Sequence, residues 1–283
     1  MKILVLGHKE MPGRDLMLGL SVGHEVEGKD MEDFDIADPK DCARMVEEYA
    51  PELIVNALAY GDVASGQEDR DRCFAVNAVA VKHLALACRE RGIPLVHISG
   101  AEVFDGRKGS PYAEEDEPAP LGVYGASRLE GERFLQAFAE PYLLIRTGWL
   151  FGRHGGNLVR DILEQAENAK ELEAAEDRIG SPTFSRDLAA AVRVLIEGGH
   201  RGIFHVANRG RCSLYELVCK TLQYSGRCDV TVRPIRSSEE SGAALHGAWS
   251  VLSGRKFFAQ TGKTLPHWQI ALQDYLEHAG YRR

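Results

Sequence analysis

The first half of the chain repeats one pattern: a short, unbroken apolar run followed by a longer amphipathic stretch. The runs lack the apolar–polar alternation of a strand with one solvated face, which is typical of parallel strands that are covered on both faces. A regular order of strand and helix predicts an α/β fold with a doubly wound parallel sheet. The expected strands are 2–7, 24–29, 53–56, 95–98 and 142–146.

Helical patterns fill the intervals between these runs. Asp38 is a suitable N-cap, because its carboxylate can accept a hydrogen bond from a free backbone N–H group, and Pro39 fits the first helical position. The longest helical pattern covers residues 68–91, with apolar side chains at helical spacing.

After about residue 150 the rhythm changes, which indicates a second, smaller lobe. A Gly-rich turn at 152–156 precedes helical patterns that are separated by short apolar runs. This order predicts an α/β lobe packed on the C-terminal edge of the sheet. The expected helices are 157–168, 185–197, 213–224 and 267–278, the expected strands are 202–207 and 230–234, and the segment 237–247 is the best candidate for a mobile loop.

Charge and composition exclude several classes of protein. The 283 residues include 34 Lys and Arg against 42 Asp and Glu, a net charge of −8, which argues against a nucleic-acid or anionic-membrane surface. The longest apolar runs are far below the ~20 residues of a membrane span. We expect no signal peptide, because the first run is not followed by the longer apolar region and small-residue cleavage site that one requires. The six cysteines form no Cys-x-x-Cys pair and the ten histidines form no metal-binding motif, so we expect reduced thiols, a cytoplasmic protein and no metal site.

The turn after the first run is a candidate phosphate loop. Gly7 and Gly13 flank it, and backbone N–H groups in such a turn can contact a pyrophosphate at the start of the following helix. Glu10 occupies the position of the middle glycine of a Gly-x-x-Gly-x-x-Gly loop, where its charge repels phosphate unless it turns away. Lys9 would offset that charge. The alternative is an ordinary tight turn that binds nothing.

Asp30 follows the second run, seventeen residues after Gly13. A carboxylate at this position accepts hydrogen bonds from an adenosine ribose and disfavours a 2′-phosphate. Met31 stands where a 2′-phosphate site would favour Arg, and Lys29 is the nearby cation. The sequence therefore favours NAD over NADP, unless Asp30 is merely a solvated loop carboxylate.

The segment from Tyr124 to Arg128, with sequence Tyr-Gly-Ala-Ser-Arg, resembles the extended short-chain dehydrogenase/reductase superfamily. Within it, the chain is similar to the dTDP-4-dehydrorhamnose reductase family along its whole length. The segments that carry this similarity are 23–26, 35–39, 51–60, 76–78, 146–152, 157–159, 180–183 and 265–268. The resemblance implies an NAD(P)-binding Rossmann domain over 1–150, to which later segments return, and a lobe over 151–283 that mainly binds substrate.

The same resemblance implies hydride transfer from NAD(P)H to a 4-keto sugar nucleotide, and it assigns roles to residues. Tyr124 matches the family's acid, Arg128 stands at the position of its lysine, and Ser99 lies next to the position of its catalytic hydroxyl. The implied cofactor contacts, with those of the phosphate loop, are Gly7, Lys9, Gly13, Asp30, Asp35, Ile36, Ala57, Ala59 and Asn77. The implied substrate contacts are Glu102, Trp149, Asn157 and His246.

Several departures from the family's pattern fall at functional positions. The catalytic hydroxyl aligns with Gly100, the lysine is replaced by Arg128, and the arginine expected near the nucleotide phosphates is His246. Two functions therefore remain open: a reductase with altered or weak activity, or a catalytically impaired relative that acts by binding a ligand or a protein partner. A homodimer is a further possibility. In a purely structural interpretation, Arg128 would pair with Glu132 one helical turn away, and Tyr124 would be a half-buried aromatic side chain.

Overall fold

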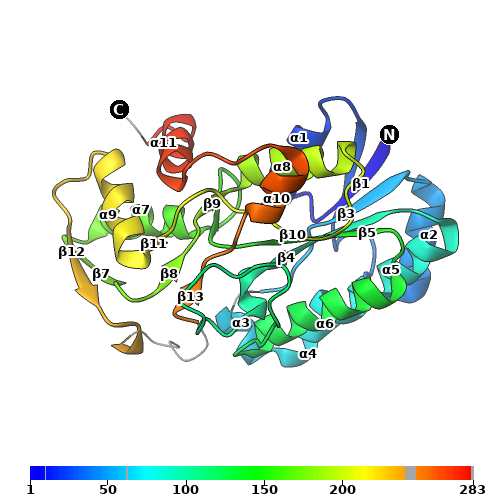
Figure 1. Cartoon of the computed structure of the whole chain (residues 1–283), viewed down its shortest axis with the longest axis horizontal. Coiled ribbons are helices and arrows are strands. Elements are labelled where there is room, and N and C mark those ends of the chain that lie inside the picture. Colours follow the sequence, from blue (N-terminus) through cyan, green and yellow to red (C-terminus); the bar gives the residue numbers. More distant parts are fainter. Residues whose placement is uncertain (10, 62, 240–246, 282–283) are drawn as a thin grey trace.

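The computed structural model describes residues 1–9, 11–61, 63–239 and 247–281. Six strands form one parallel sheet in the order β10-β5-β4-β3-β1-β2 (Figure 1). Their bounds are β1 Lys2–Leu6, β2 Glu25–Lys29, β3 Leu53–Asn56, β4 Leu95–Gly100, β5 Tyr142–Thr147 and β10 Gly202–His205. The predicted doubly wound α/β sheet is confirmed, and the strand order reverses between β1 and β3.

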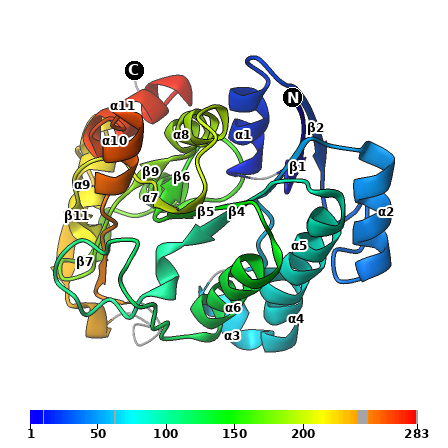
Figure 2. The same ribbon diagram turned by 45° about the vertical axis from the view of Figure 1, so that its right-hand side comes forward.

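Helices cover both faces of this sheet, which explains why its strands are apolar without alternation. Along β1, Ile3 and Val5 join a buried cluster with α1 and α8, whereas Leu4 and Leu6 join another with α2 and α5. Figure 2 shows α1 and α8 on one side and α5 and α6 on the other. The bounds are α1 Gly13–Leu20, α2 Pro39–Tyr49, α5 Ala80–Arg91, α6 Val123–Phe138 and α8 Ser185–Glu197.

The helix predicted at 68–91 is wrong as a single element. Four pieces replace it: α3 Val63–Glu68, α4 Arg70–Phe74, a π-helical turn Ala75–Val79 and α5. Asp69 caps α4 by accepting from the Arg72 N–H group, so a helix starts inside the predicted one. In the π-helical turn the buried Asn77 amide bonds the backbone of Tyr60 and donates to Ser127 Oγ. These contacts join residues that are far apart in the sequence, so the helical periodicity of residues 68–91 cannot predict them.

The second lobe packs small sheets against three helices, around the rings of Phe151, Phe184 and Tyr275. Its helices are α7 Leu158–Asn168, α9 Leu214–Tyr224 and α11 Trp268–His278. Its strands are β6 Leu150–Phe151, β7 Glu171–Ala175, β8 Ile179–Gly180, β9 Thr183–Phe184, β11 Cys212–Ser213, β12 Thr231–Ile235 and β13 Trp249–Ser250. Short 3-10 helices occupy Ala101–Val103 and Ser237–Glu239. Most of the loop expected at 237–247 lies outside the described residues.

Helix starts in both lobes follow from capping side chains. Asp38 caps α2 as predicted, with Pro39 as its first residue. Asn157, Ser213 and His267, which were expected to begin helices, are the N-caps of α7, α9 and α11. In each case the side chain accepts a hydrogen bond from a backbone N–H group of the first turn, as a cap does.

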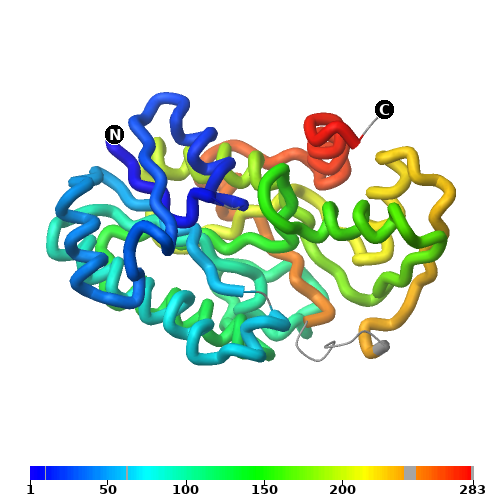
Figure 3. The backbone as a smooth tube through the Cα atoms, turned by 180° about the vertical axis from the view of Figure 1, so that it is seen from behind, coloured from blue at the N-terminus to red at the C-terminus, as the bar shows by residue number. Residues whose placement is uncertain are grey.

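Segments from the second half of the chain return to the large sheet. The strand expected at 202–207 in the small lobe is instead β10, the edge strand that pairs with β5. Helix α10, Arg255–Thr261, packs on β10, and α8 packs on α1. Figure 3 shows the orange segment around residue 250 crossing from the second lobe back to the sheet.

Two further observations concern the described part of the chain. No helix there is both long and apolar enough to span a bilayer. Nor do three or more His, Cys, Asp or Glu side chains gather there in an arrangement suited to a metal ion.

Candidate active site

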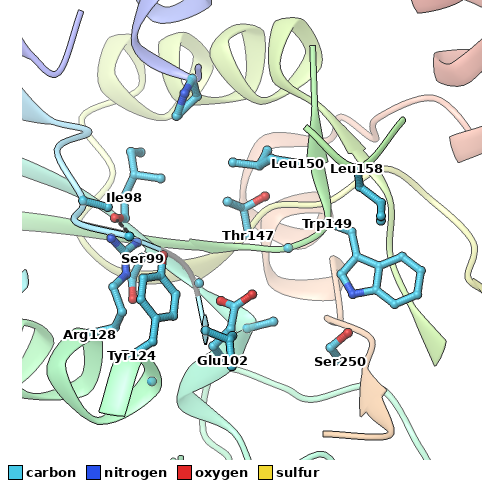
Figure 4. A pocket seen from close by; sticks show the side chains of 18 of the residues that line it. Ile98, Ser99, Glu102, Tyr124, Arg128, Thr147, Trp149, Leu150, Leu158 and Ser250 are labelled. Carbon is cyan, nitrogen blue, oxygen red and sulfur yellow. Dashed lines mark hydrogen bonds between the residues drawn. The ribbon is translucent and has the colours of Figure 1, made fainter. Parts of the chain in front are cut away.

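A cleft of about 660 Å³ opens at the carboxyl ends of the strands, where the strand order reverses. Ligands of open α/β sheets bind at such a reversal. The ends of β1, β3, β4 and β5 form one wall, and Leu158, Arg178 and Trp249 of the second lobe form the other. Figure 4 shows Tyr124, Glu102, Thr147 and Trp149 around this space. The cleft therefore lies between the six-stranded parallel sheet and the second lobe.

The end of β1 suits close approach of a ligand. Gly7 has a φ of +82°, and a Cβ there would lie 2.9 Å from the backbone nitrogen of Leu58. Only glycine fits both conditions. Ala57 and Ala59, which follow β3, line the same part of the cleft. Small side chains at these positions leave the room that a dinucleotide backbone requires.

Asp30 also lines the cleft, at the end of β2. Its carboxylate accepts from the N–H groups of Lys9, at 3.2 Å, and Met31, at 2.9 Å. A carboxylate has about four acceptor positions, so sites remain for a ribose diol. The Lys9 ammonium is paired with Glu32, which leaves it badly placed for a 2′-phosphate.

Two hydroxyl groups in the cleft support the presence of a ligand there. Ser99 Oγ and Thr147 Oγ1 are buried and have no hydrogen-bond partner among the described residues. Buried polar atoms are normally satisfied by protein, water or ligand. Together with the Gly7 turn and Asp30, these atoms fit a dinucleotide that would supply the missing partners.

Tyr124 and Arg128 both line the cleft from the first turns of α6. Four-residue spacing places them on one helix face, with the guanidinium carbon 5.9 Å from the centre of the tyrosine ring. Arg128 is buried, and its Nη2 donates to the carbonyl oxygen of Ile98 at 2.6 Å. The guanidinium is therefore anchored to β4, and its charge is close to the phenol.

The pairing of Arg128 with Glu132, which helical spacing suggests, is wrong. Glu132 instead accepts from Arg146 on β5, with Nη2–Oε2 at 2.6 Å and Nε contacts at 3.1 Å. Both side chains of this pair are almost completely buried. Strand β5 packs against α6, so the Glu132 carboxylate pairs with Arg146, fourteen positions along the chain, and not with Arg128 on its own helix. Arg128 remains directed to the cleft.

Strand alternation at the end of β4 separates Ser99 from Gly100. Ile98 packs with the α1 and α8 cluster, so Ser99 points to the α6 side and Gly100 to the opposite face. Glu102 follows in the 3-10 helix, and Figure 4 shows its carboxyl group directed into the cleft. Burial raises the pKa of this carboxyl group, against the opposing effects of its own backbone N–H group and of the Arg128 and Arg178 charges.

The second lobe contributes Trp149 and Arg178, of which only Trp149 was singled out from the sequence. Trp149 has a φ of +46°, a left-handed conformation that costs of order 1–3 kcal/mol outside glycine and is frequent at functional sites. Arg178 lies 5.9 Å from its ring centre and lines the cleft. Its position two residues before the 180–183 segment was a usable signal. Trp268, by contrast, is a core residue.

The structure brings some of the other expected site residues to the cleft and leaves some away from it. The expected site residues described above line it, whereas six others do not: Lys9, Gly13, Asp35, Ile36, Asn77 and Asn157. Asp35 accepts from the Ala37 N–H group, Ile36 is in the core, and Gly13 packs on Gly7. Asn77 is held in the π-helical turn, and Asn157 caps α7. Glu10 and His246 lie outside the described residues.

His97 of β4 lies behind the cleft and makes stability depend on pH. Burial, followed by the Arg128 charge, lowers its pKa to about 3. The unfolded chain binds a proton at this histidine below about pH 6.5 and the folded chain does not, so the free energy of unfolding decreases as pH falls from about 6.5 towards 3. The contribution is about 1.4 kcal/mol per pH unit.

We expect His97→Asn to remove this contribution. Urea denaturation between about pH 4 and 7 would show a flatter pH dependence for the variant than for the unaltered protein. His205, whose pKa burial also lowers to about 3, is present in both proteins and cancels in the comparison. Parallel pH curves would contradict the assignment.

The fold and the cleft define an NAD(P)-binding Rossmann architecture of the extended short-chain dehydrogenase/reductase type. A family model described as "RmlD substrate binding domain" matches residues 1–280. The chain belongs to this family, which confirms the resemblance seen in its motifs.

Known proteins resemble the chain over nearly its full length. The spore coat polysaccharide biosynthesis protein SpsK of Bacillus subtilis (strain 168) is 33% identical over 277 residues, covering 98% of this chain and 97% of that protein. A dTDP-4-dehydrorhamnose reductase of Burkholderia thailandensis is 33% identical over 288 residues, covering 96% and 97%. The crystal structure of dTDP-4-dehydrorhamnose reductase from Bacillus anthracis in complex with NADP has a TM-score of 0.93 at 28% identity, covering 98% and 99%.

Proposed function

We propose that the protein is an NAD(P)H-dependent reductase of a 4-keto sugar nucleotide, of the dTDP-4-dehydrorhamnose reductase type, with altered or weak activity. The observation that carries this proposal is the placement of Tyr124 and Arg128. Both enter one cleft, beside the nucleotide-type turn of Gly7 and opposite Trp149 and Arg178 of the second lobe. Relatives named as such reductases support the same reaction class.

In this proposal, a bound reduced nicotinamide supplies a hydride to the carbonyl carbon of the substrate. Tyr124 donates its hydroxyl proton to the carbonyl oxygen, as a general acid. The Arg128 charge near the ring favours the phenolate that remains, because an opposite charge stabilises an ionised group. Arginine does not release a proton readily, so proton return to Tyr124 is expected to come from water rather than from Arg128.

The residues that would hold the cofactor lie on the sheet side of the cleft. Gly7, Ala57 and Ala59 leave room for its phosphates, and Asp30 would accept from the adenosine ribose. Lys9, Gly13, Asp35, Ile36 and Asn77 would support these contacts from outside the lining. On the other side, Arg178 offers a positive charge to a sugar nucleotide's phosphates, Trp149 a surface for its sugar, and Asn157 would position α7.

The decisive experiment combines binding and turnover. Calorimetry with NADH and NADPH, with the variant Glu10→Gly in parallel, measures whether the cofactor site is functional. Turnover of dTDP-4-keto-6-deoxy sugars, followed by loss of the reduced cofactor, then tests the reaction. Binding with slow turnover is the expected result. Tight cofactor binding without turnover of any 4-keto sugar nucleotide would contradict the proposal.

A second candidate is a ligand-binding or regulatory protein that acts through a partner. Two observations favour it: Gly100 lacks the hydroxyl group, and the Arg128 guanidinium is already bonded to Ile98. If only Glu10→Gly bound a cofactor, the phosphate loop would be a disabled site and this second function would be preferred. Light scattering of the purified protein would test for a homodimer.

Asp30 provides a prediction about cofactor choice. We expect the unaltered protein to bind NADH more tightly than NADPH, because the carboxylate repels a 2′-phosphate and Lys9 is paired with Glu32. Asp30→Ala is expected to weaken NADH binding by about 10- to 150-fold, since it removes a charged hydrogen-bond acceptor worth about 1.5–3 kcal/mol. The same substitution is expected to narrow or reverse the preference for NADH over NADPH. Calorimetry of both proteins measures this. An unaltered protein that prefers NADPH would contradict it.

A further inference from the structure

The side chain of Glu102 fills the space that a side chain at position 100 would occupy. A Cβ built on Gly100 would lie 2.0 Å from Glu102 Oε2. Gly100 has an extended backbone, with φ −131° and ψ 166°, so its conformation does not require glycine. The hydroxyl oxygen of a serine at position 100 would lie one bond length from this Cβ, and therefore close to the position that Glu102 Oε2 now occupies.

This carboxyl group belongs to the cleft. Glu102 lines it together with Tyr124 and Arg128, and Figure 4 shows the carboxyl group reaching into it. The charged groups that act on it are Arg128 from α6 and Arg178 from the second lobe. Burial outweighs both and raises the pKa of the carboxyl group. A protonated carboxyl group carries one O–H donor, which a carboxylate lacks.

We propose that Glu102 replaces the missing hydroxyl group of position 100, and that its carboxylic acid donates a hydrogen bond to the carbonyl oxygen of the substrate. This inference rests on the proposed function and deepens it. The hydrogen-bond donor that is missing at Gly100 is then supplied by Glu102, two residues further along the chain. Glu102 is a catalytic residue in this arrangement, because it contacts the reacting oxygen.

The step balances as follows. The bound reduced nicotinamide would supply the hydride and be oxidised, because its own C–H bond breaks. The hydride brings the electron pair of the new C–H bond at the carbonyl carbon, and the electrons of the broken C=O π bond move to the oxygen. The carbonyl oxygen takes the proton of the Tyr124 hydroxyl, which leaves a phenolate. Glu102 keeps its proton throughout and stabilises the negative charge that develops on the oxygen.

Three variants test this role. Glu102→Ala is expected to lower kcat by about 10²-fold, the effect of removing one oxyanion donor, while the affinity for the cofactor is unchanged. Glu102→Gln, whose amide still donates, is expected to retain most of the activity. The double variant Gly100→Ser with Glu102→Ala is expected to recover at least about 10-fold over Glu102→Ala, because the serine hydroxyl takes the vacated place. Rescue by a hydroxyl at position 100 distinguishes a donor from a merely structural residue.

A second readout does not depend on turnover. An infrared difference spectrum between the unaltered protein and Glu102→Gln at neutral pH should contain the C=O band of a protonated carboxyl group. An ionised carboxylate band in its place would overturn the inference. An active protein whose kcat is unaffected by Glu102→Ala would also overturn it, and the proposed function would stand. If the unaltered protein binds cofactor but reduces no 4-keto sugar nucleotide, the proposed function itself fails, and the role of Glu102 with it.

Discussion

Tyr124→Phe is expected to reduce kcat for a 4-keto sugar nucleotide by about 10²- to 10⁴-fold, the contribution of one general acid. The substitution removes only the hydroxyl group, and the ring keeps its place beside Arg128. Cofactor affinity and the KM for the sugar nucleotide should change little, since the proton is transferred only in the transition state. Steady-state kinetics with calorimetry of the cofactor measures both quantities.

Tyr142 offers a matched control on the same sheet. It begins β5, at the end of the strand opposite to the cleft, and is half-buried like Tyr124. Tyr142→Phe should leave kcat within about 2-fold, because this residue lies away from the reacting carbonyl. Equal activity of the Tyr124 and Tyr142 variants would remove Tyr124 from the mechanism.

The second large effect is expected on stability, at the buried ion pair of Arg146 and Glu132. Glu132→Gln removes the carboxylate that compensates an arginine with 3% of its side chain exposed. Removal of one partner of a buried pair leaves an uncompensated charge and costs about 3–5 kcal/mol. We therefore expect the midpoint of urea denaturation to fall strongly, with little change in the slope of the transition.

The same helix provides the control for this substitution. Glu130 pairs with Arg133 at 3.3 Å on the exposed side of α6. Glu130→Gln is expected to change the free energy of unfolding by less than about 1 kcal/mol, because exposed ion pairs contribute little. A loss of less than about 1 kcal/mol for Glu132→Gln as well would show that the buried pair is not needed for stability.

Local signals in the sequence predicted local structure well. The bounds of β3 and α8 follow directly from an apolar run and a helical pattern, and Asp38 marked the start of α2. The signals failed where a distant contact decides the geometry. The π-helical turn depends on the amide of Asn77, which bonds across to Ser127, and no periodicity in residues 68–91 reveals that partner.

The site shows the same limit. Motif spacing placed Tyr124 and Arg128 together, and both line the cleft. Spacing also suggested the ion pair with Glu132, which β5 takes instead. The sequence showed that position 100 lacks a hydroxyl group. It did not show that the Glu102 carboxyl group occupies the space beside Gly100. The 3-10 turn Ala101–Val103 brings that carboxyl group to the cleft, and the spacing of residues in the sequence does not reveal this turn.

The position of β10 has a consequence for how the chain could be divided. Its pairing with β5 completes the large sheet with residues that follow α7 and strands β6 to β9 of the second lobe in the chain. A fragment ending at residue 150 would leave the backbone N–H and C=O groups of β5 open along one edge, and such an edge recruits other chains. It would also uncover the face that α8 protects. Neither half of the chain therefore contains all the strands of the large sheet, and a cut at residue 150 would separate β10 from its partner β5.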